Sequence, residues 1–316
     1  MVKINPIAYP VDQRHNPAKR NFIMTRYTIS LNHPCHLRIA LVTDLHDHPC
    51  EQLLDALHEQ QPDVIAVAGD LLERFEPDDG EFDAFEDLDE QTKGYPAWKK
   101  TFYHLLYHLD ALFGQLHRTH RNDTESNANA YAFLNAASRI APIYYALGNH
   151  ERYVNEADRA AIAATGAILL DNIYTTTEVG GCTLWIGGLS SRGLLGDTDW
   201  LTDFCNAVAA EAQPTLKVLL CHHPEYYPRL ETAGFRLDAI DLVLSGHAHG
   251  GQMCLFGKPL FAPGQGFFPK LAGGVYDGRL IVGRGLSNTA HTPRVNNPME
   301  LVMIDIAGGN CTRQCE

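Results

Sequence analysis

The stretch Leu244-Ser245-Gly246-His247-Ala248-His249-Gly250-Gly251-Gln252 decides how the rest of the sequence is interpreted. It continues an apolar run, 242–244, that is typical of a buried strand. In an extended segment the two histidine side chains would lie on opposite faces, whereas near a turn they can diverge towards two adjacent ions. The flanking glycines permit the backbone angles that such a turn needs. Taken alone, the stretch fits two ordinary loop histidines equally well.

Four further polar clusters follow predicted buried strands. Apolar runs predict these strands at 37–42, 64–68, 142–147 and 216–220. The clusters that follow them are Asp44-Leu45-His46, Gly69-Asp70, Gly148-Asn149-His150-Glu151 and His222-His223-Pro224. A helical pattern at 50–60 lies between the first two strands and makes them a βαβ unit of a parallel sheet. Because the carboxyl ends of parallel strands meet at one edge, we expect all five clusters to converge.

The residue types in these clusters suit metal binding. Carboxylates, imidazoles and one amide, without a thiolate, favour borderline to hard ions such as Mn²⁺, iron or Zn²⁺. One carboxylate shared between two ions, with three further ligands on each ion, accounts for seven residues. The clusters therefore predict a centre of two divalent metal ions.

The ordered set of motifs resembles that of the calcineurin-like metallophosphoesterase superfamily. Within it, the stretch GHAHGGQ is similar to the GHxHGGQ motif of a bacterial branch. Further similar stretches are Pro263-Gly264-Gln265-Gly266, Gly283-Arg284-Gly285-Leu286 and Pro293-Arg294. The resemblance covers most of the chain after about residue 25. It implies an α/β fold, a four-layer α/β/β/α sandwich, in a single domain over residues 1–316.

The resemblance also implies a role for each motif residue. The residues for the first ion are Asp44, His46 and His249, those for the second are Asn149, His222 and His247, and Asp70 would bridge the two. The expected cofactors are two Mn²⁺ ions, with iron or zinc as alternatives. The implied activity is that of a metal-dependent phosphoric ester hydrolase, which cleaves a monoester or diester of a small phosphorylated substrate through a metal-bridging hydroxide.

Four residues near these ligands have more than one interpretation. His150 matches the family's histidine beside the scissile group, which implies general-acid catalysis or transition-state stabilisation; the alternative is a hydrogen-bonding role behind the ligands. Glu73 and Glu151 are the candidates to orient His150, although phosphoprotein-phosphatase relatives carry Asp where this chain has Glu73. Arg284 would hold a substrate phosphate or pair with a ligand carboxylate.

Charge is concentrated in one part of the chain. Residues 73–90 contain ten carboxylates and one arginine, in a chain whose net charge is -13. No long basic patch is present, which argues against a nucleic-acid partner. Residues 73–141, longer than usual for the branch, combine this run with a helical pattern at 98–117. They would form either a cap over the ions or a solvated insertion. Residues 1–22 are expected to form an N-terminal arm.

The cysteines and the apolar runs predict the compartment. The eight cysteines include no CxxC pair, and neither a signal peptide nor a run of about 20 apolar residues is present, so we expect a cytoplasmic protein with reduced thiols. A Cys311–Cys315 disulfide is the alternative for the tail.

Two other functions compete with a small-molecule phosphoesterase. One is a lipid-linked phosphodiester or pyrophosphate hydrolase associated with the membrane without an anchor, which an exposed apolar patch would favour. The other is a non-catalytic, metal-binding regulatory protein on the same fold. The sequence makes no prediction of the oligomeric state.

Overall fold

The computed structural model describes residues 3–10, 20–31, 35–74, 95–98, 100–101, 104–105, 127–191, 198–288 and 294–308, with the backbone alone for 3–10. Most of the predicted 73–141 insertion therefore lies outside the described residues, and so does the Cys311–Cys315 pair. Across the described ranges, no helix has both the length and the apolarity needed to span a membrane.

The first sheet has seven strands in the order β1-β2-β17-β3-β4-β5-β6. The strands, in that order, are Lys3–Pro10, Phe22–Leu31, Met299–Gly308, His36–Val42, Val64–Ala68, Ile143–Ala146 and Ile168–Leu169. The strands β3 to β6 run parallel to one another. The strand β2 lies inside the sheet, because β1 pairs with one side of it and β17 with the other. The predicted N-terminal arm thus contributes a strand of its own.

The second sheet has six strands in the order β15-β16-β10-β9-β8-β7. These strands are Gly274–Tyr276, Leu280–Val282, Leu242–Ser245, Thr215–Cys221, Cys182–Leu189 and Ile173–Val179. The central strands β8, β9, β10 and β16 are parallel. The hairpin between β15 and β16 turns at Asp277 and Gly278, both with positive φ, as a type I′ turn requires.

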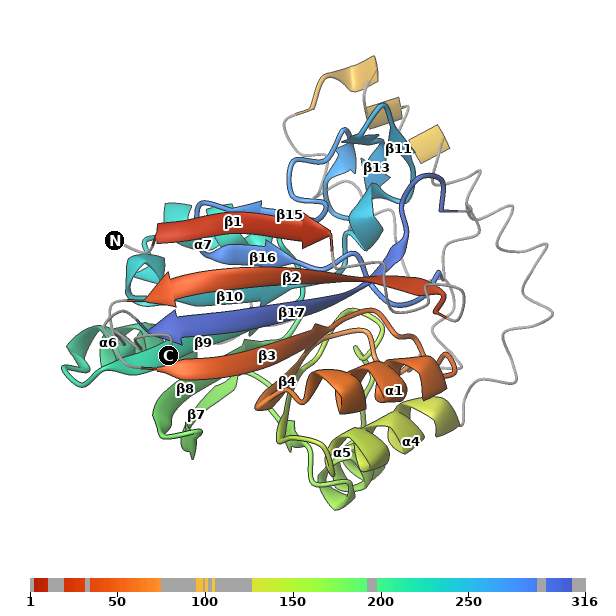
Figure 1. The fold of residues 1–316 in the computed structure, drawn as a ribbon. Helices are drawn as coiled ribbons and strands as arrows, with labels where there is room; N and C mark the ends of the chain where they lie inside the picture. Colours follow the sequence, from red (N-terminus) through yellow and green to blue (C-terminus); the bar gives the residue numbers. More distant parts are fainter. Residues whose placement is uncertain are drawn as a thin grey trace.

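The two sheets pack face to face, with helices on both outer surfaces (Figure 1). Alternate residues of β3 divide between two cores: Leu37, Ile39 and Leu41 face the second sheet, whereas Ala40 and Val42 face helices. The helices on the first sheet are α1 (Glu51–Gln60), α4 (Ala128–Ala137) and α5 (Glu156–Ala164). Those on the second are α6 (Asp199–Ala210) and α7 (Tyr226–Thr232). The four-layer α/β/β/α sandwich is thereby confirmed.

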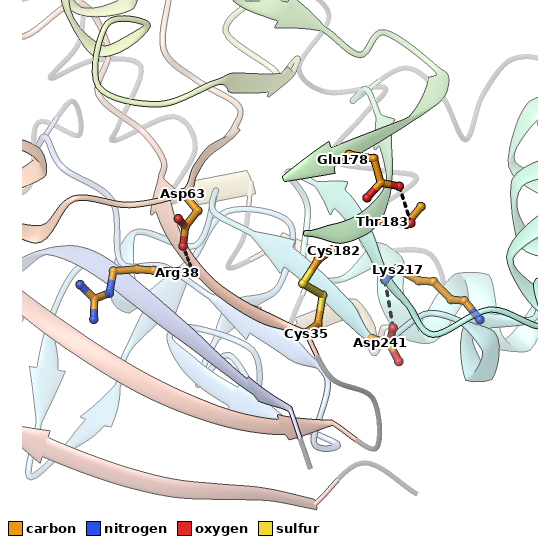
Figure 2. The surroundings of a disulfide bond; sticks show 8 residues. All are labelled: Cys35, Arg38, Asp63, Glu178, Cys182, Thr183, Lys217 and Asp241. Carbon is orange, nitrogen blue, oxygen red and sulfur yellow. Dashed lines mark hydrogen bonds between the residues drawn. A yellow bond between two sulfur atoms is a disulfide. The ribbon is translucent and has the colours of Figure 1, made fainter. Parts of the chain in front are cut away.

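A disulfide joins the two sheets at the amino ends of their strands (Figure 2). Cys35 directly precedes β3, Cys182 is the first residue of β8, and their Cα atoms lie 5.3 Å apart. Both residues are buried, at 3% and 5% exposure. The prediction of fully reduced thiols is therefore wrong for this pair.

Two small hairpins follow the second sheet's β10. The short 3-10 helix η4 (His249–Gly251) leads into β11 (Cys254–Leu255) and β12 (Lys258–Pro259), and then into β13 (Phe261–Ala262) and β14 (Gly266–Phe267). Figure 1 shows them as a separate projection above the sheets, and β13 packs against η4. After residue 252, the described residues form strands and no helix.

Candidate metal centre

The five predicted clusters lie at the carboxyl ends of five strands. Three of these strands, β3, β4 and β5, are neighbours in the first sheet, and β9 and β10 are neighbours in the second. Because β4 and β5 also contact β9 across the interface, the two sheets present their clusters to one another. Convergence therefore involves both sheets, and it brings the seven predicted ligands into one buried region.

The first group consists of Asp44, His46 and His249. One ligand atom of each lies within 4.8 Å of those of the other two. Nε2 of His249 is 3.5 Å from Oδ1 of Asp44. Within the described part of the chain, Asp44 Oδ2 and His46 Nε2 are buried and have no hydrogen-bond partner. Such buried polar atoms are costly unless something binds them, and a cation would satisfy both.

The second group consists of Asp70, His222 and His247, again with ligand atoms within 4.8 Å of one another. The amide of Asn149 joins them, because its Oδ1 lies 3.1 Å from Nε2 of His222. The other nitrogen of His222, Nδ1, lies 2.7 Å from the carbonyl oxygen of Ala68. A histidine that donates Nδ1–H to a carbonyl has Nε2 available to an ion.

Asp70 lies between the two groups. Its Oδ2 is 3.6 Å from Nε2 of His46 in the first group and 3.1 Å from Nε2 of His222 in the second. Burial alone would raise the pKa of Asp70, but His222, His150 and His46 hold it well below its ordinary value. An ionised carboxylate in contact with both groups is what a shared ligand requires.

The backbone is in an unfavourable conformation at most of these positions. Five of the seven predicted ligands have positive φ, namely Asp44, His46, Asp70, His247 and His249. Each such residue costs about 1–3 kcal/mol, and residues of this kind cluster at functional sites. Two glycines leave room for the side chains: a Cβ on Gly69 would lie 2.5 Å from Nδ1 of His222, and one on Gly148 would lie 2.1 Å from Oδ1 of Asp70.

One carboxylate holds two of the histidines from behind. Glu73 Oε1 lies 2.6 Å from Nδ1 of His46, and Oε2 lies 2.9 Å from Nδ1 of His150. Burial would raise the pKa of Glu73, but the hydrogen bonds from His150 and His46 lower it to about 2. The sequence predicted the contact with His150, while the contact with His46 was missed. The longer side chain of Glu compared with Asp does not prevent this role.

The second candidate to orient His150, Glu151, has a different role. Its carboxylate is buried and accepts hydrogen bonds from four backbone amides and from the hydroxyl of Tyr145. The amides are those of Asp70, Leu71, Leu72 and Gly148. The proposal that Glu151 orients His150 is therefore wrong: Glu151 instead ties the ends of β4 and β5 together and fixes the backbone of Asp70.

Burial and Asp70 act in opposite directions on the remaining imidazoles. Burial would lower the pKa of His222, but the adjacent Asp70 raises it to about 10. For His249 burial prevails and lowers the pKa to about 4, and for His247 burial, with His223 and His222 nearby, lowers the pKa well below the ordinary value. A cation binding at His222 must therefore displace a proton.

Two arginines near the ligands have different partners. Nε of Arg284 lies 3.9 Å from Oε2 of Glu300, so its carboxylate partner in the structure is not a predicted ligand. That alternative for Arg284 is wrong, and contact with a substrate phosphate stays a prediction. Nη2 of Arg294, which the sequence singled out only as part of a motif, lies 3.1 Å from Nδ1 of His249. The two residues are 45 positions apart, so no local sequence pattern could have predicted their contact.

The donor set fits divalent cations of borderline to hard character. Two carboxylates, four imidazoles and one amide converge, and two of their atoms are otherwise unsatisfied. Carboxylate and imidazole ligands suit Mn²⁺, iron and Zn²⁺. The residues present therefore form clusters that could bind divalent metal ions.

Comparison with known proteins gives a family match and two relatives. The model of the calcineurin-like phosphoesterase family matches residues 37–251. YpbG of Bacillus subtilis (strain 168), an uncharacterized protein, is 31% identical over 118 residues, which are 37% of this chain and 42% of YpbG. Cj0846 of Campylobacter jejuni subsp. jejuni, an uncharacterized metallophosphoesterase, is 25% identical over 284 residues, covering 86% of this chain and 59% of that protein. The chain thus spans about half the length of the curated relatives it matches.

Solved structures with some likeness include two hydrolases. The 5'-nucleotidase precursor from Thermus thermophilus has a TM-score of 0.39 and 16% identity, over 70% of this chain and 43% of that one. Phosphopantetheinyl hydrolase (PptH) from Mycobacterium tuberculosis has a TM-score of 0.36 and 10% identity, over 79% of this chain and 89% of that one.

The family match coincides with the site. Residues 37–251 include all seven predicted ligands together with His150, and they contain the five strands whose ends carry them, apart from the first residue of β3. Arg284 lies beyond the matched segment. This chain belongs to the calcineurin-like phosphoesterase family.

Proposed function

We propose that the protein is a metal-dependent phosphoesterase that binds two divalent ions. The residues for the first ion are Asp44, His46 and His249, those for the second are Asn149, His222 and His247, and Asp70 is shared. The observation that carries the proposal is the position of Asp70 Oδ2, 3.6 Å from His46 Nε2 and 3.1 Å from His222 Nε2. When bound, two such ions neutralise phosphate charge and lower the pKa of a coordinated water.

His150 is the residue we propose to act on the ester itself. Glu73 holds its Nδ1, which directs Nε2 towards the site, where it lies 4.0 Å from Oδ2 of Asp70. Its side chain is 19% exposed, in contrast to the fully buried ring of His46. A partly exposed imidazole fixed in this way can donate a proton to a leaving oxygen or stabilise the transition state.

The proposal also names a metal and a class of substrate. We propose Mn²⁺ as the metal and a small phosphorylated molecule as the substrate, either a monoester or a diester. The disulfide Cys35–Cys182 favours an oxidising compartment over the cytoplasm predicted from the sequence, because such bonds are rare where thiols are kept reduced.

The test is hydrolysis of p-nitrophenyl phosphate and bis-p-nitrophenyl phosphate by chelator-treated protein, with Mn²⁺ added back. We expect Mn²⁺-dependent turnover by the wild type and loss of turnover in Asp70→Asn, which weakens both ion sites. The control is Asp63→Asn, an aspartate beside β4 whose carboxylate accepts a backbone hydrogen bond from Arg38. Wild-type turnover in Asp70→Asn would refute the shared-ligand assignment. Two bound ions without any turnover would favour the non-catalytic regulatory alternative.

A second candidate function is favoured by an exposed apolar patch on the two small hairpins. The patch consists of Leu255, Phe256, Phe261 and Phe268, of which Phe256 is 95% exposed and Phe268 is 68% exposed. Exposed clusters of large apolar side chains mark interaction sites. Residues 253–276 contain two lysines and no carboxylate, although the chain's net charge is -13.

This combination fits the surface of an anionic bilayer, where aromatic side chains insert and each lysine contributes about 1 kcal/mol. The patch also lies on the segment that follows His249, so a bound bilayer would present phosphate head groups near the site. On this view the substrate is a lipid-linked phosphodiester or pyrophosphate.

Co-sedimentation with vesicles of phosphatidylcholine and phosphatidylglycerol tests the second candidate. We expect the wild type to sediment with anionic vesicles and the double variant Phe256→Ser, Phe268→Ser to stay in solution. Ile173→Ser, which removes a similarly exposed apolar side chain (51%) from β7, is the control. Equal sedimentation of all three proteins, or none by the wild type, would exclude the lipid-surface function and leave the phosphoesterase proposal intact.

A further inference from the structure

A second set of buried polar side chains lies behind the predicted ligands of the second ion. It consists of His223 and Glu225, which follow β9, and the partly buried Ser191, which follows β8, lies beside them. His223 is 8% exposed and Glu225 is 9% exposed. None of these three residues is a predicted ligand of either ion. Buried polar groups of this kind need partners, and their partners indicate what they do.

The carboxylate of Glu225 faces two imidazoles. Its Oε1 lies 3.1 Å from Nδ1 of His223 and 3.8 Å from Nε2 of His247. The other oxygen, Oε2, is buried and has no hydrogen-bond partner among the described residues. A negative charge withdrawn from water is costly unless cationic or N–H groups surround it. The carboxylate is therefore placed to accept a hydrogen bond from His223, and it faces His247 at ion-pair distance.

His223 is held on all sides and is poorly placed to bind an ion itself. Its Nδ1 contacts Glu225, and its Nε2 lies 2.9 Å from the hydroxyl of Ser191. Its ring stacks on Tyr226 with centroids 4.5 Å apart and lies 4.1 Å from the ring of His247. The ring of His223 thus packs against the ring of His247, and the carboxylate of Glu225 also contacts His247.

The absence of a side chain at Gly264 leaves room for the carboxylate of Glu225. A Cβ on Gly264 would lie 2.1 Å from Oε1 of Glu225, and the residue has φ +67°. The turn that contains it is fixed by Gln265, whose side chain makes two hydrogen bonds to the backbone of Leu271. The Pro263-Gly264-Gln265-Gly266 stretch thereby has a physical role in accommodating Glu225.

We propose that Glu225 is a positioning residue for the second ion: its Oε1 faces Nε2 of His247 and holds that ring, whose other nitrogen would bind an ion shared with Asp70 and His222. This inference rests on the two-ion function proposed above. Ligand histidines commonly donate their second N–H to a carboxylate, and loss of that carboxylate lowers metal affinity about 10–100-fold. The alternative, in which His223, Glu225 and His247 bind an ion of their own, is an outcome of the same experiment.

The experiment is a calorimetric titration of the metal-free protein with Mn²⁺, with the bound metal counted by mass spectrometry. We expect two ions per wild-type chain. In Glu225→Gln one affinity should fall about 10–100-fold while the other is unchanged, and Glu225→Asp should recover part of the loss. The unchanged site shows that the variant is folded.

A second pair of variants reaches the same carboxylate through the backbone. Gly264→Ala should lower the affinity for the same ion, because the new Cβ would displace the carboxylate of Glu225. Gly257→Ala is the matched control, with φ +76° and no atom within 4 Å of its Cβ. Wild-type affinities in Glu225→Gln would overturn the inference. A third ion in the wild type that is missing in Glu225→Gln, with the other two ions unchanged, would also overturn it. A wild type that does not bind two ions would instead refute the proposed function.

Discussion

Replacement of Glu151 by glutamine should destabilise the fold far more than a change of one atom suggests. The carboxylate accepts five hydrogen bonds, three at Oε1 and two at Oε2. An amide has one acceptor oxygen, so at least the two backbone N–H groups at Oε2, those of Asp70 and Gly148, lose their acceptor. These are amides in the loops that carry predicted ligands.

The magnitude follows from that count. Each buried N–H left without a partner costs about 1–3 kcal/mol, which gives about 2–6 kcal/mol for two. The bonds that remain lose the assistance of a charge, which adds to the cost. Burial and the neighbouring Asp70 raise the pKa of Glu151, so removing its charge returns part of this free energy. We expect a net loss of about 3–5 kcal/mol in the free energy of unfolding.

Urea unfolding of the metal-free protein, followed by far-UV circular dichroism, measures this loss. Tyr145→Phe is one control: it removes a single donor, leaves no backbone amide unpaired and should cost about 1 kcal/mol. Glu156→Gln, at a side chain that is 96% exposed, should cost almost nothing. A Glu151→Gln variant within about 0.5 kcal/mol of the wild type would refute this explanation of how the ligand loops are held.

Three further predictions concern other parts of the molecule. Reduction of Cys35–Cys182, which are 147 positions apart, should lower stability by about 4–5 kcal/mol on chain-entropy grounds; an unchanged melting temperature in dithiothreitol would contradict this. The pKa of Glu73 is lowered to about 2, so its contribution to stability is complete above the ordinary value near pH 4.5 and is lost as the pH falls towards 2. Glu73→Gln should flatten the stability–pH profile of the metal-free protein in that window, and an unaltered profile would count against the contact. Gly148→Ala should weaken Mn²⁺ binding at both sites in titration, since its Cβ would lie 2.1 Å from Oδ1 of Asp70. Wild-type affinity in this variant would contradict the prediction and show that the loop can move to accommodate the methyl group.

Much of the site follows from the sequence because its ligands come directly after strands. The apolar runs predicted the strands before Asp44, Asp70, Asn149, His222 and His247, and parallel pairing brings strand ends together. Local patterns and this rule account for the convergence within each sheet, whereas the meeting of the two sets of strand ends depends on how the sheets stack. The donor types from which the metal class was inferred are likewise visible in the sequence.

Other features depend on packing that no local pattern encodes. The pairing of Cys35 with Cys182 requires the two sheets to stack, because the residues are 147 positions apart. The place of β2 in the interior of its sheet depends on β17, which comes from the other end of the chain. The partner of Arg284, Glu300, likewise emerges only when β17 enters the sheet beside β3.

The sequence did not separate the roles of the carboxylates near the site, because it offered Glu73 and Glu151 alike as candidates to orient His150. Both Glu73 and Glu151 lie close to His150 along the chain or in space, and only their side-chain directions separate them. Glu225 follows a histidine motif that suggested no function for it, and its two imidazole partners come from different strand ends. Which histidine each of these carboxylates contacts is therefore decided by the three-dimensional fold and not by a local sequence pattern.

The most direct test of the two-ion centre is the anomalous diffraction of crystals grown with Mn²⁺. We expect two manganese peaks roughly 3.5–4 Å apart, one on each side of the Asp70 carboxylate. One peak should lie among Asp44, His46 and His249, and the other among Asn149, His222 and His247. A single peak at full occupancy, or two peaks that do not share Asp70, would contradict the central claim.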